Sequence, residues 1–329
     1  MVLVLALLFG STALLVILSL PVGVYTVLFT TLAQGYGAST PVYTFVWAGP
    51  LPVTLPVAIP VGVLCVLELA IYAVLLAYTF AHQSLLAAFS AGFNDGVSCL
   101  FSSDLVVVLT SVGFYIFSAL IIDVFVTSSG APIGGISESN ALFYFVIQTV
   151  SPLREEVGFR VGVIGVVAFL LALGTSRKGL LRALWRPSTV YESDLVRTGK
   201  MITVLAALVA SSAIFGAWHV LSGSGWDIGK LPGATFGGLV LGYLYIKRGF
   251  HVAVLTHWGI DYVGTVFAFF GQGAYGIPWE QTPGFFLQQV VSVDMIEFLG
   301  LASFLLVIYV GVFKVRRPDQ STRGSTGSP

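Results

Sequence analysis

Apolar runs of about 20 residues recur along most of the chain, and no other feature constrains its fold as strongly. Hydrophobic residues make up 57% of the 329 residues, and the mean hydropathy is +0.95. A helix needs about 20 apolar residues to cross about 30 Å of hydrocarbon. The spans of a β-barrel are short alternating segments, which this sequence lacks. We therefore expect an all-α protein, a polytopic bundle of transmembrane helices.

The apolar runs divide into eight candidate spans. The stretch Val42–Pro60 is also apolar, but its four prolines argue against a ninth helix. We expect an irregular or interfacial connector there. The eight spans are expected at Leu3–Leu32, Pro56–Ala81, Leu105–Val126, Leu142–Leu173, Met201–Leu221, Leu231–Ile246, Val252–Phe270 and Phe285–Phe313.

Lysine and arginine are confined mainly to alternate loops of this arrangement. Of the 15 basic residues, six follow the fourth span, two follow the sixth and four follow the eighth. Because basic residues concentrate in cytoplasmic loops, we expect a multi-pass integral membrane protein, in contact with membrane lipid, with both termini in the cytoplasm. The net charge is zero and no basic stripe is present, so we expect no nucleic acid partner.

A charge cluster interrupts the fourth span at Ser151–Gly162. It holds four charged residues within seven positions, although only 9% of the chain is charged. Ionised groups at membrane depth are costly, so such a cluster indicates a functional site. Glu156 and Arg160 are four residues apart and should pair on one helix face. That pairing leaves Glu155 turned toward another helix.

Two later spans contain histidines that could meet this cluster. His219 ends the fifth span, and His257 shares a helix face with Asp261 in the seventh. With His219 beside it, Glu155 could take a proton from water. His257 and Asp261 could stabilise an oxyanion, or could bind a divalent metal such as zinc together with the other two residues. The residues alone leave both alternatives open, a metal ion or none.

The depths of these side chains give conflicting expectations. His219 lies toward the outer end of its span, and His257 toward the cytoplasmic end of its own. At about 1.5 Å per residue, the two histidines could lie about 10–15 Å apart in depth. They converge if the spans tilt, or if Pro152 marks a break that lets water reach inward.

Three short motifs carry a resemblance to a known family. They are Glu155-Glu156-x-x-x-Arg160, Phe215-x-x-x-His219 and His257-x-x-x-Asp261. They resemble the three motifs of the CPBP family of CAAX proteases and bacteriocin-processing proteins, in the same order and each in its own span. Pro152 precedes the two glutamates, as it often does in that family. The resemblance covers Ser151–Phe270.

The resemblance implies an intramembrane endopeptidase. Its substrate would be a membrane-bound protein or peptide, cut near a membrane-embedded or lipid-modified C-terminus. Glu155 and His219 would activate the hydrolytic water, and Glu156 and Arg160 would support the site. Residues 1–140 would then form N-terminal transmembrane helices and connectors, 141–313 the CPBP-like catalytic core, and 314–329 a disordered cytoplasmic tail.

The second residue of the oxyanion pair departs from the family pattern. His257 and the residue four positions later would stabilise the oxyanion, and the prenyl-protease members tend to have asparagine at that later position. Here it is Asp261. An ionised carboxylate cannot donate a hydrogen bond. Asp261 must therefore be protonated, bind a metal ion, or orient His257.

A different class of function is also compatible with the sequence. Buried acids such as Glu68 and Asp123 could serve as proton relays in a proton-coupled transporter, or the chain could be a non-proteolytic membrane scaffold. Transporters of this kind often carry paired Gly- or Pro-broken helices in two repeats. No such pair is evident, so we place the protease first.

Overall fold

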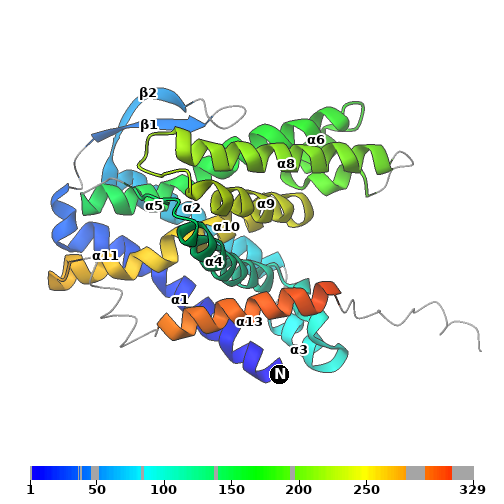
Figure 1. Cartoon of the computed structure of the whole chain (residues 1–329), viewed down its shortest axis with the longest axis horizontal. Helices are drawn as coiled ribbons and strands as arrows, with labels where there is room; N and C mark the ends of the chain where they lie inside the picture. Colours follow the sequence, from blue (N-terminus) through cyan, green and yellow to red (C-terminus); the bar gives the residue numbers. More distant parts are fainter. Residues whose placement is uncertain are drawn as a thin grey trace, which may run out of the picture.

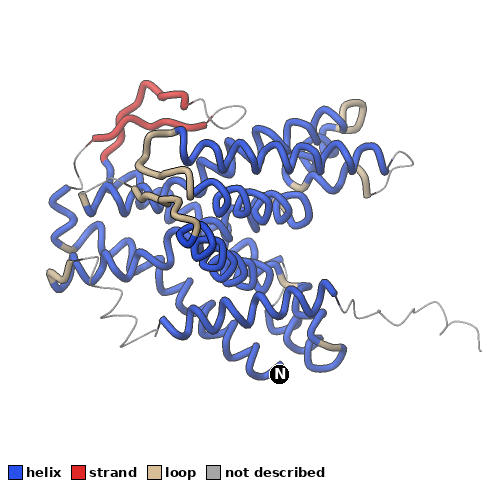
Figure 2. The backbone as a smooth tube through the Cα atoms, in the orientation of Figure 1, coloured by secondary structure: helices blue, strands red, loops and turns tan. Residues whose placement is uncertain are grey.

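The chain folds into a bundle of helices with one two-stranded hairpin at its edge (Figures 1 and 2). This arrangement confirms the predicted all-α class. The structure is a computed structural model, and it describes residues 2–35, 37, 39–45, 52–82, 85–136, 140–192, 197–278 and 293–312. The expected tail at 314–329 lies outside the described residues.

Each predicted span contains helix, although Pro56–Pro60 of the second is strand and residues 285–292 of the eighth lie outside the described residues. The long helices are α1 (Val2–Phe29), α2 (Val61–His82), α4 (Asp104–Ser128), α8 (Arg197–Leu221), α9 (Lys230–Arg248) and α13 (Val293–Val312). The predicted fourth span is α5 (Ala141–Glu155), η3 (Glu156–Gly165) and α6 (Val166–Leu171), and the seventh is α10 (Phe250–Trp258), η5 (Gly259–Val263) and α11 (Gly264–Tyr275). Shorter helices are η1 (Thr31–Gly35), α3 (Leu85–Asp95), η2 (Val97–Ser102), α7 (Arg177–Trp185) and η4 (Pro187–Val190).

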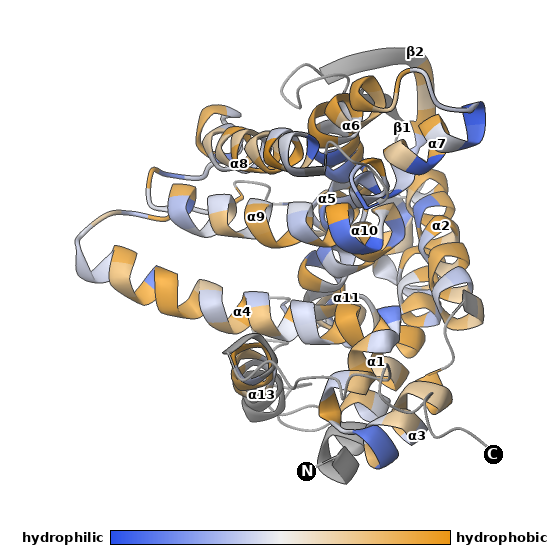
Figure 3. Cartoon of the chain, turned by 90° about the vertical axis from the view of Figure 1, so that its right-hand side faces the viewer, coloured by the Kyte–Doolittle hydropathy of each residue, from blue (hydrophilic) through white to orange (hydrophobic). Residues whose placement is uncertain are grey.

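Five helices among the described residues are long and apolar enough to cross a membrane, so the predicted count of eight is not confirmed. They are Phe9–Phe29, Val61–Ala81, Asp104–Ser128, Thr198–Leu221 and Phe250–Tyr275. The predicted fourth span is not among them because every 18-residue stretch of its helical part contains at least three charged residues of the Ser151–Gly162 cluster. Helix α9 is less apolar because it contains four glycines and has basic residues at both ends. The outward faces of α4 and α8 are largely hydrophobic (Figure 3), as expected for contact with lipid.

The Pro-rich connector is more regular than the sequence suggested. Strands β1 (Ser39–Phe45) and β2 (Pro52–Pro60) pair antiparallel, with an irregular register between Pro41 and Tyr43. The expectation of an irregular connector was therefore wrong, whereas the absence of a ninth span holds for this part of the chain. In a two-stranded ribbon both strands are edges, so a proline can turn its missing N–H away from the partner strand.

Helix α9 lies side by side with α8 (Figure 1), and glycine makes the close approach feasible. A Cβ added to Gly238 would lie 2.8 Å from Ser212 Cα, and one added to Gly216 would lie 3.0 Å from the Leu231 carbonyl oxygen. Small residues permit such approaches between membrane helices. The glycine face of α9 is accordingly enclosed.

An aromatic stack fixes the position of α10 and η5. The Trp258 ring stacks on Tyr72 of α2 and on Tyr262 of η5, each with 5.0 Å between ring centroids. The Tyr262 hydroxyl donates to the Ser19 carbonyl of α1 at 2.8 Å, and the Tyr72 hydroxyl donates to the Thr149 carbonyl of α5 at 2.9 Å. Three neighbouring helices therefore hold the segment that carries His257 and Asp261.

Candidate active site

The first motif lies where the chain changes from α- to π-helical geometry. Helix α5 begins at an N-cap, since Asn140 Oδ1 accepts from the Leu142 and Phe143 amides. The helix then continues through Pro152 to Glu155, so of the two conditions for convergence a break at Pro152 is not the one met. The π-helical turns of η3 begin at Glu156 instead. Such turns occur often at functional sites.

Glu156 and Arg160 form the predicted ion pair. Arg160 Nε lies 3.2 Å from Glu156 Oε2, and both side chains are fully enclosed. The guanidinium also lies over the Phe215 ring of α8, 4.3 Å from its centroid. On the same helix, the Ser211 hydroxyl donates to the Phe159 carbonyl at 2.7 Å. The side chain of Ser211 thereby ties α8 to the π-helical segment.

His257 is surrounded by three carboxylates. Its Nδ1 lies 2.8 Å from Glu156 Oε1, and its Nε2 lies 3.6 Å from Glu155 Oε2 and 3.4 Å from Asp261 Oδ2. An ionised carboxylate only accepts hydrogen bonds, so Nδ1–H donates to Glu156. No sequence pattern indicates this contact, because it joins residues 101 positions apart. Nε2 is left to face the other two carboxylates.

His219 is fixed by its own helix. Its Nδ1 lies 2.9 Å from the Phe215 carbonyl oxygen, which can only accept, so Nδ1–H donates and Nε2 keeps a lone pair. The Phe215 ring contacts both imidazoles, with centroid separations of 4.6 Å to His219 and 5.9 Å to His257. The depth conflict seen in the sequence is therefore absent from the fold.

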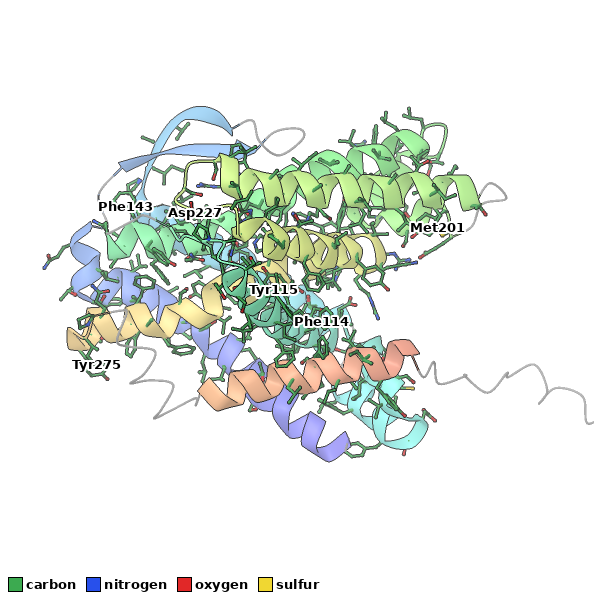
Figure 4. The ribbon with its side chains drawn as sticks, in the orientation of Figure 1. Phe114, Tyr115, Phe143, Met201, Asp227 and Tyr275 are labelled. Atoms are coloured by element: carbon green, nitrogen blue, oxygen red, sulfur yellow. The ribbon has the colours of Figure 1, made fainter. Side chains whose placement is uncertain are left out.

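A cavity of about 530 Å³ brings the motif residues together. Glu155, His219, His257 and Asp261 all line it. Further side chains line the cavity that were not predicted from the sequence, namely Tyr115, Gln148, Ser151, Trp218, Trp226 and Lys230. Figure 4 shows Tyr115 near the centre of the molecule, on α4. A hydropathy reading could not single out these residues, because each is a common residue in or beside an apolar helix.

Two loops are joined beside this cavity. The Asp227 amide donates to the Ile133 carbonyl at 2.9 Å, and the Gly135 amide donates to the Gly225 carbonyl at 3.0 Å. Gly134 has φ +72°, and a Cβ there would lie 2.4 Å from the Gly225 carbonyl oxygen. The first loop precedes α5 and the second joins α8 to α9, so these hydrogen bonds connect the segments that carry the first two motifs.

The four motif side chains do not form a metal site as they stand. Among the described residues, no group of three or more His, Cys, Asp or Glu side chains is arranged to hold a metal ion. Each histidine nevertheless commits Nδ1–H to an acceptor, and both residues line the cavity, so each Nε2 is the nitrogen left for a water molecule or a metal ion. The metal alternative therefore stays untested.

Two buried polar residues, Glu68 and His251, lie outside this cavity. Glu68, one of the buried acids, does not line it. His251 follows two basic residues, a pattern typical of a surface position. It is instead buried, with Nε2 lying 3.2 Å from Asp104 Oδ2, and Arg248 pairs with the same carboxylate at 3.2 Å. A partner 147 positions away, which the sequence pattern could not indicate, accounts for the difference.

Taken together, fold and site define a helical membrane protein with a buried carboxylate and histidine centre. Residues 137–263 match the family model described as Rce1-like, type II CAAX prenyl endopeptidase. That segment contains every motif residue identified above. No curated protein and no solved structure matches the chain. The chain thus contains an Rce1-like domain, which is consistent with the CPBP family of CAAX proteases and confirms the resemblance seen in the sequence.

The family match also bears on the class of protein. The Rce1-like family is a CAAX prenyl endopeptidase, a hydrolase, and it implies a membrane-associated protein substrate. The family and the apolar helices together indicate an integral membrane protein. The division at 140 and 313, the orientation of the termini and the expectation of no nucleic acid partner stay predictions.

Proposed function

We propose that the protein is an intramembrane endopeptidase that cuts a peptide bond near the membrane-embedded or lipid-modified C-terminus of a protein. The observation that carries the proposal is the position of Glu155. Its Oε2 is buried, lies 3.6 Å from His257 Nε2 and has no hydrogen-bond partner among the described residues, and the Glu155 residue lines a cavity that two histidines also line. A buried carboxylate with an open acceptor is suited to bind and activate a water molecule.

In the proposed reaction Glu155 accepts a proton from this water as the water oxygen attacks the carbonyl carbon of the scissile bond. Nε2 of His219 accepts a hydrogen bond from the second water hydrogen and so orients the nucleophile; this hydrogen stays on the attacking oxygen and leaves with the new carboxyl group. The carbonyl electron pair moves to oxygen, and the oxyanion then collapses with cleavage of the C–N bond. Glu155 returns its proton to the departing amine, so each proton is accounted for.

His257 is proposed to stabilise the oxyanion. Because Nδ1–H is committed to Glu156, Nε2 can donate only when the imidazole carries both protons. The carboxylates of Glu156 and Asp261 favour that cation by charge, and Asp261 Oδ2 lies 3.4 Å from Nε2. Asp261 then orients His257 and stabilises its cation by charge, while the single Nε2–H turns to the oxyanion, and this role does not require asparagine.

The orientation predicted from the loop charges places the cavity loops on the non-cytoplasmic side. The loops at 132–136 and 222–229 lie at the ends of their helices opposite to the basic loops at 174–200 and 247–249. We propose that both termini are cytoplasmic, that lipid surrounds the bundle, and that the substrate reaches the cavity from the other face of the membrane.

The test is cleavage by the purified full-length protein in lipid vesicles, using a peptide with a lipid-modified cysteine near its C-terminus. Glu155→Ala and His219→Ala should each abolish cleavage while the elution profile and the melting temperature stay close to those of the native protein. Full activity in either folded variant would overturn the proposed function.

A further inference from the structure

A second cavity, of about 500 Å³, lies apart from the candidate active site. Helix α7 forms one side of it, and Val161 of η3 and Phe250 of α10 contribute to the other. Figure 3 shows α7 near the edge of the molecule, with hydrophilic and hydrophobic residues on adjacent positions. We call this cavity the α7 groove. It shares no lining residue with the active-site cavity.

The α7 side of the groove combines cationic and apolar side chains on one face. Lys178, Leu181, Arg182 and Trp185 line it at positions i, i+3, i+4 and i+7, which share a helix face. Leu181 is 58% exposed and Trp185 is 40% exposed. Within the described part of the chain, neither Lys178 nor Arg182 forms an ion pair. The two cationic side chains start about 5–6 Å apart, so both can reach one anionic group.

The groove is already shaped by tertiary contacts. The Trp185 ring stacks on His251 with centroids 5.6 Å apart, and it lies 5.9 Å from the Phe250 ring. The Tyr245 hydroxyl of α9 donates to the Leu184 carbonyl. Helix α7 is thereby held against α9 and α10, and an apolar chain could enter without any rearrangement of these elements.

We propose that the α7 groove binds an anionic membrane phospholipid. Its phosphate and headgroup would lie between Lys178 and Arg182, and an acyl chain would lie along Leu181, Trp185 and Phe250. Basic pockets between membrane helices recognise anionic headgroups in this way. A zwitterionic lipid carries no net charge to match the two cations. The proposal does not depend on the proposed peptidase activity.

The test measures quenching of tryptophan fluorescence in the detergent-solubilised full-length protein. Dioleoylphosphatidylglycerol with brominated acyl chains should quench saturably, and Trp185→Phe should remove that component. Lys178→Gln and Arg182→Gln should each weaken the apparent affinity about fivefold. Arg177→Gln is the matched control, since it removes the same charge from the neighbouring position but does not line the groove. It should leave the affinity unchanged.

Three results would overturn the proposal. Equal saturable quenching by brominated phosphatidylcholine would show that charge is not recognised. Equal weakening by Arg177→Gln and Lys178→Gln would show a diffuse surface effect rather than a groove. Displacement of the lipid by inorganic phosphate at millimolar concentration would show an anion site that does not require an acyl chain. Elution profiles establish that each variant is folded before the comparison is made.

Discussion

The substitution Glu156→Gln tests two roles of this carboxylate, which are to position His257 at the site and to stabilise the fold through its ion pair with Arg160. Glu156 is fully buried and makes two different contacts, with Arg160 Nε at 3.2 Å and with His257 Nδ1 at 2.8 Å. Glutamine has nearly the same shape but no charge. Arg160 would keep the carbonyl oxygen of the amide as its acceptor, which turns the amide NH₂ toward His257. Nδ1 would then have to accept rather than donate.

Two losses of different size follow from this geometry. Removing one partner of a buried ion pair costs about 3–5 kcal/mol of stability, because the other charge is left uncompensated. Removing the carboxylate that fixes a catalytic histidine in the correct tautomer costs up to about 10⁴-fold in kcat. We therefore expect a lower melting temperature together with a fall in kcat of at least about 100-fold.

The double variant Glu156→Gln/Arg160→Met distinguishes the two losses. Methionine removes the buried cation while keeping much of the side-chain volume beside Phe215, so most of the lost stability should return. The tautomer of His257 is still wrong, so cleavage should stay low. The assay pairs thermal melting in detergent with single-turnover cleavage of the lipid-modified peptide. Recovery of cleavage along with stability would refute the positioning role, as would near-native kcat in the single variant.

Three further predictions concern the same site and its setting. Asp261→Asn should lower kcat about tenfold to 100-fold without loss of folding, because an amide cannot hold the His257 cation by charge; an unchanged kcat would refute the orienting role. Cleavage should persist in protein shown to be metal-free by elemental analysis, since the proposed reaction assigns proton transfer to Glu155 and oxyanion stabilisation to His257 and no step to a metal ion; stoichiometric zinc lost together with activity would select the metal mechanism. In a variant without Cys65 and Cys99, a membrane-impermeant thiol reagent applied outside intact cells should label Ser222→Cys but not Arg177→Cys, and the reverse would overturn the proposed orientation.

Hydropathy predicted much of the fold because a segment that crosses lipid must be apolar and helical. Each predicted span contains helix within the described residues, since a chain without water must satisfy its backbone hydrogen bonds locally. The number of membrane-crossing helices predicted from hydropathy is not confirmed, since five rather than eight are found among the described residues. The fourth predicted span is kept out of that count by its charge cluster, and nothing in a pattern of apolar residues marks its change to π geometry at Glu156. The hairpin was missed because the prolines suggested irregular backbone, whereas an edge strand tolerates them.

The sequence predicts those features of the candidate site that depend on short motifs or on contacts between residues close together in the chain. The Glu156 and Arg160 pair and the His257 and Asp261 pair are both four residues apart, and both are present. The bond from His257 to Glu156 crosses between helices, so only the fold reveals it. Tyr115 was missed for the same reason, since it reaches the cavity from α4.

The most direct test of the central claim compares two buried glutamates. Glu155 lines the cavity with both histidines, whereas Glu68 is buried on α2 outside it. Glu155→Gln and Glu68→Gln remove the same charge from the same kind of environment. The account predicts that mass spectrometry of the peptide products detects cleavage by Glu68→Gln and none by Glu155→Gln. Cleavage by the folded Glu155→Gln variant at the native rate would contradict it.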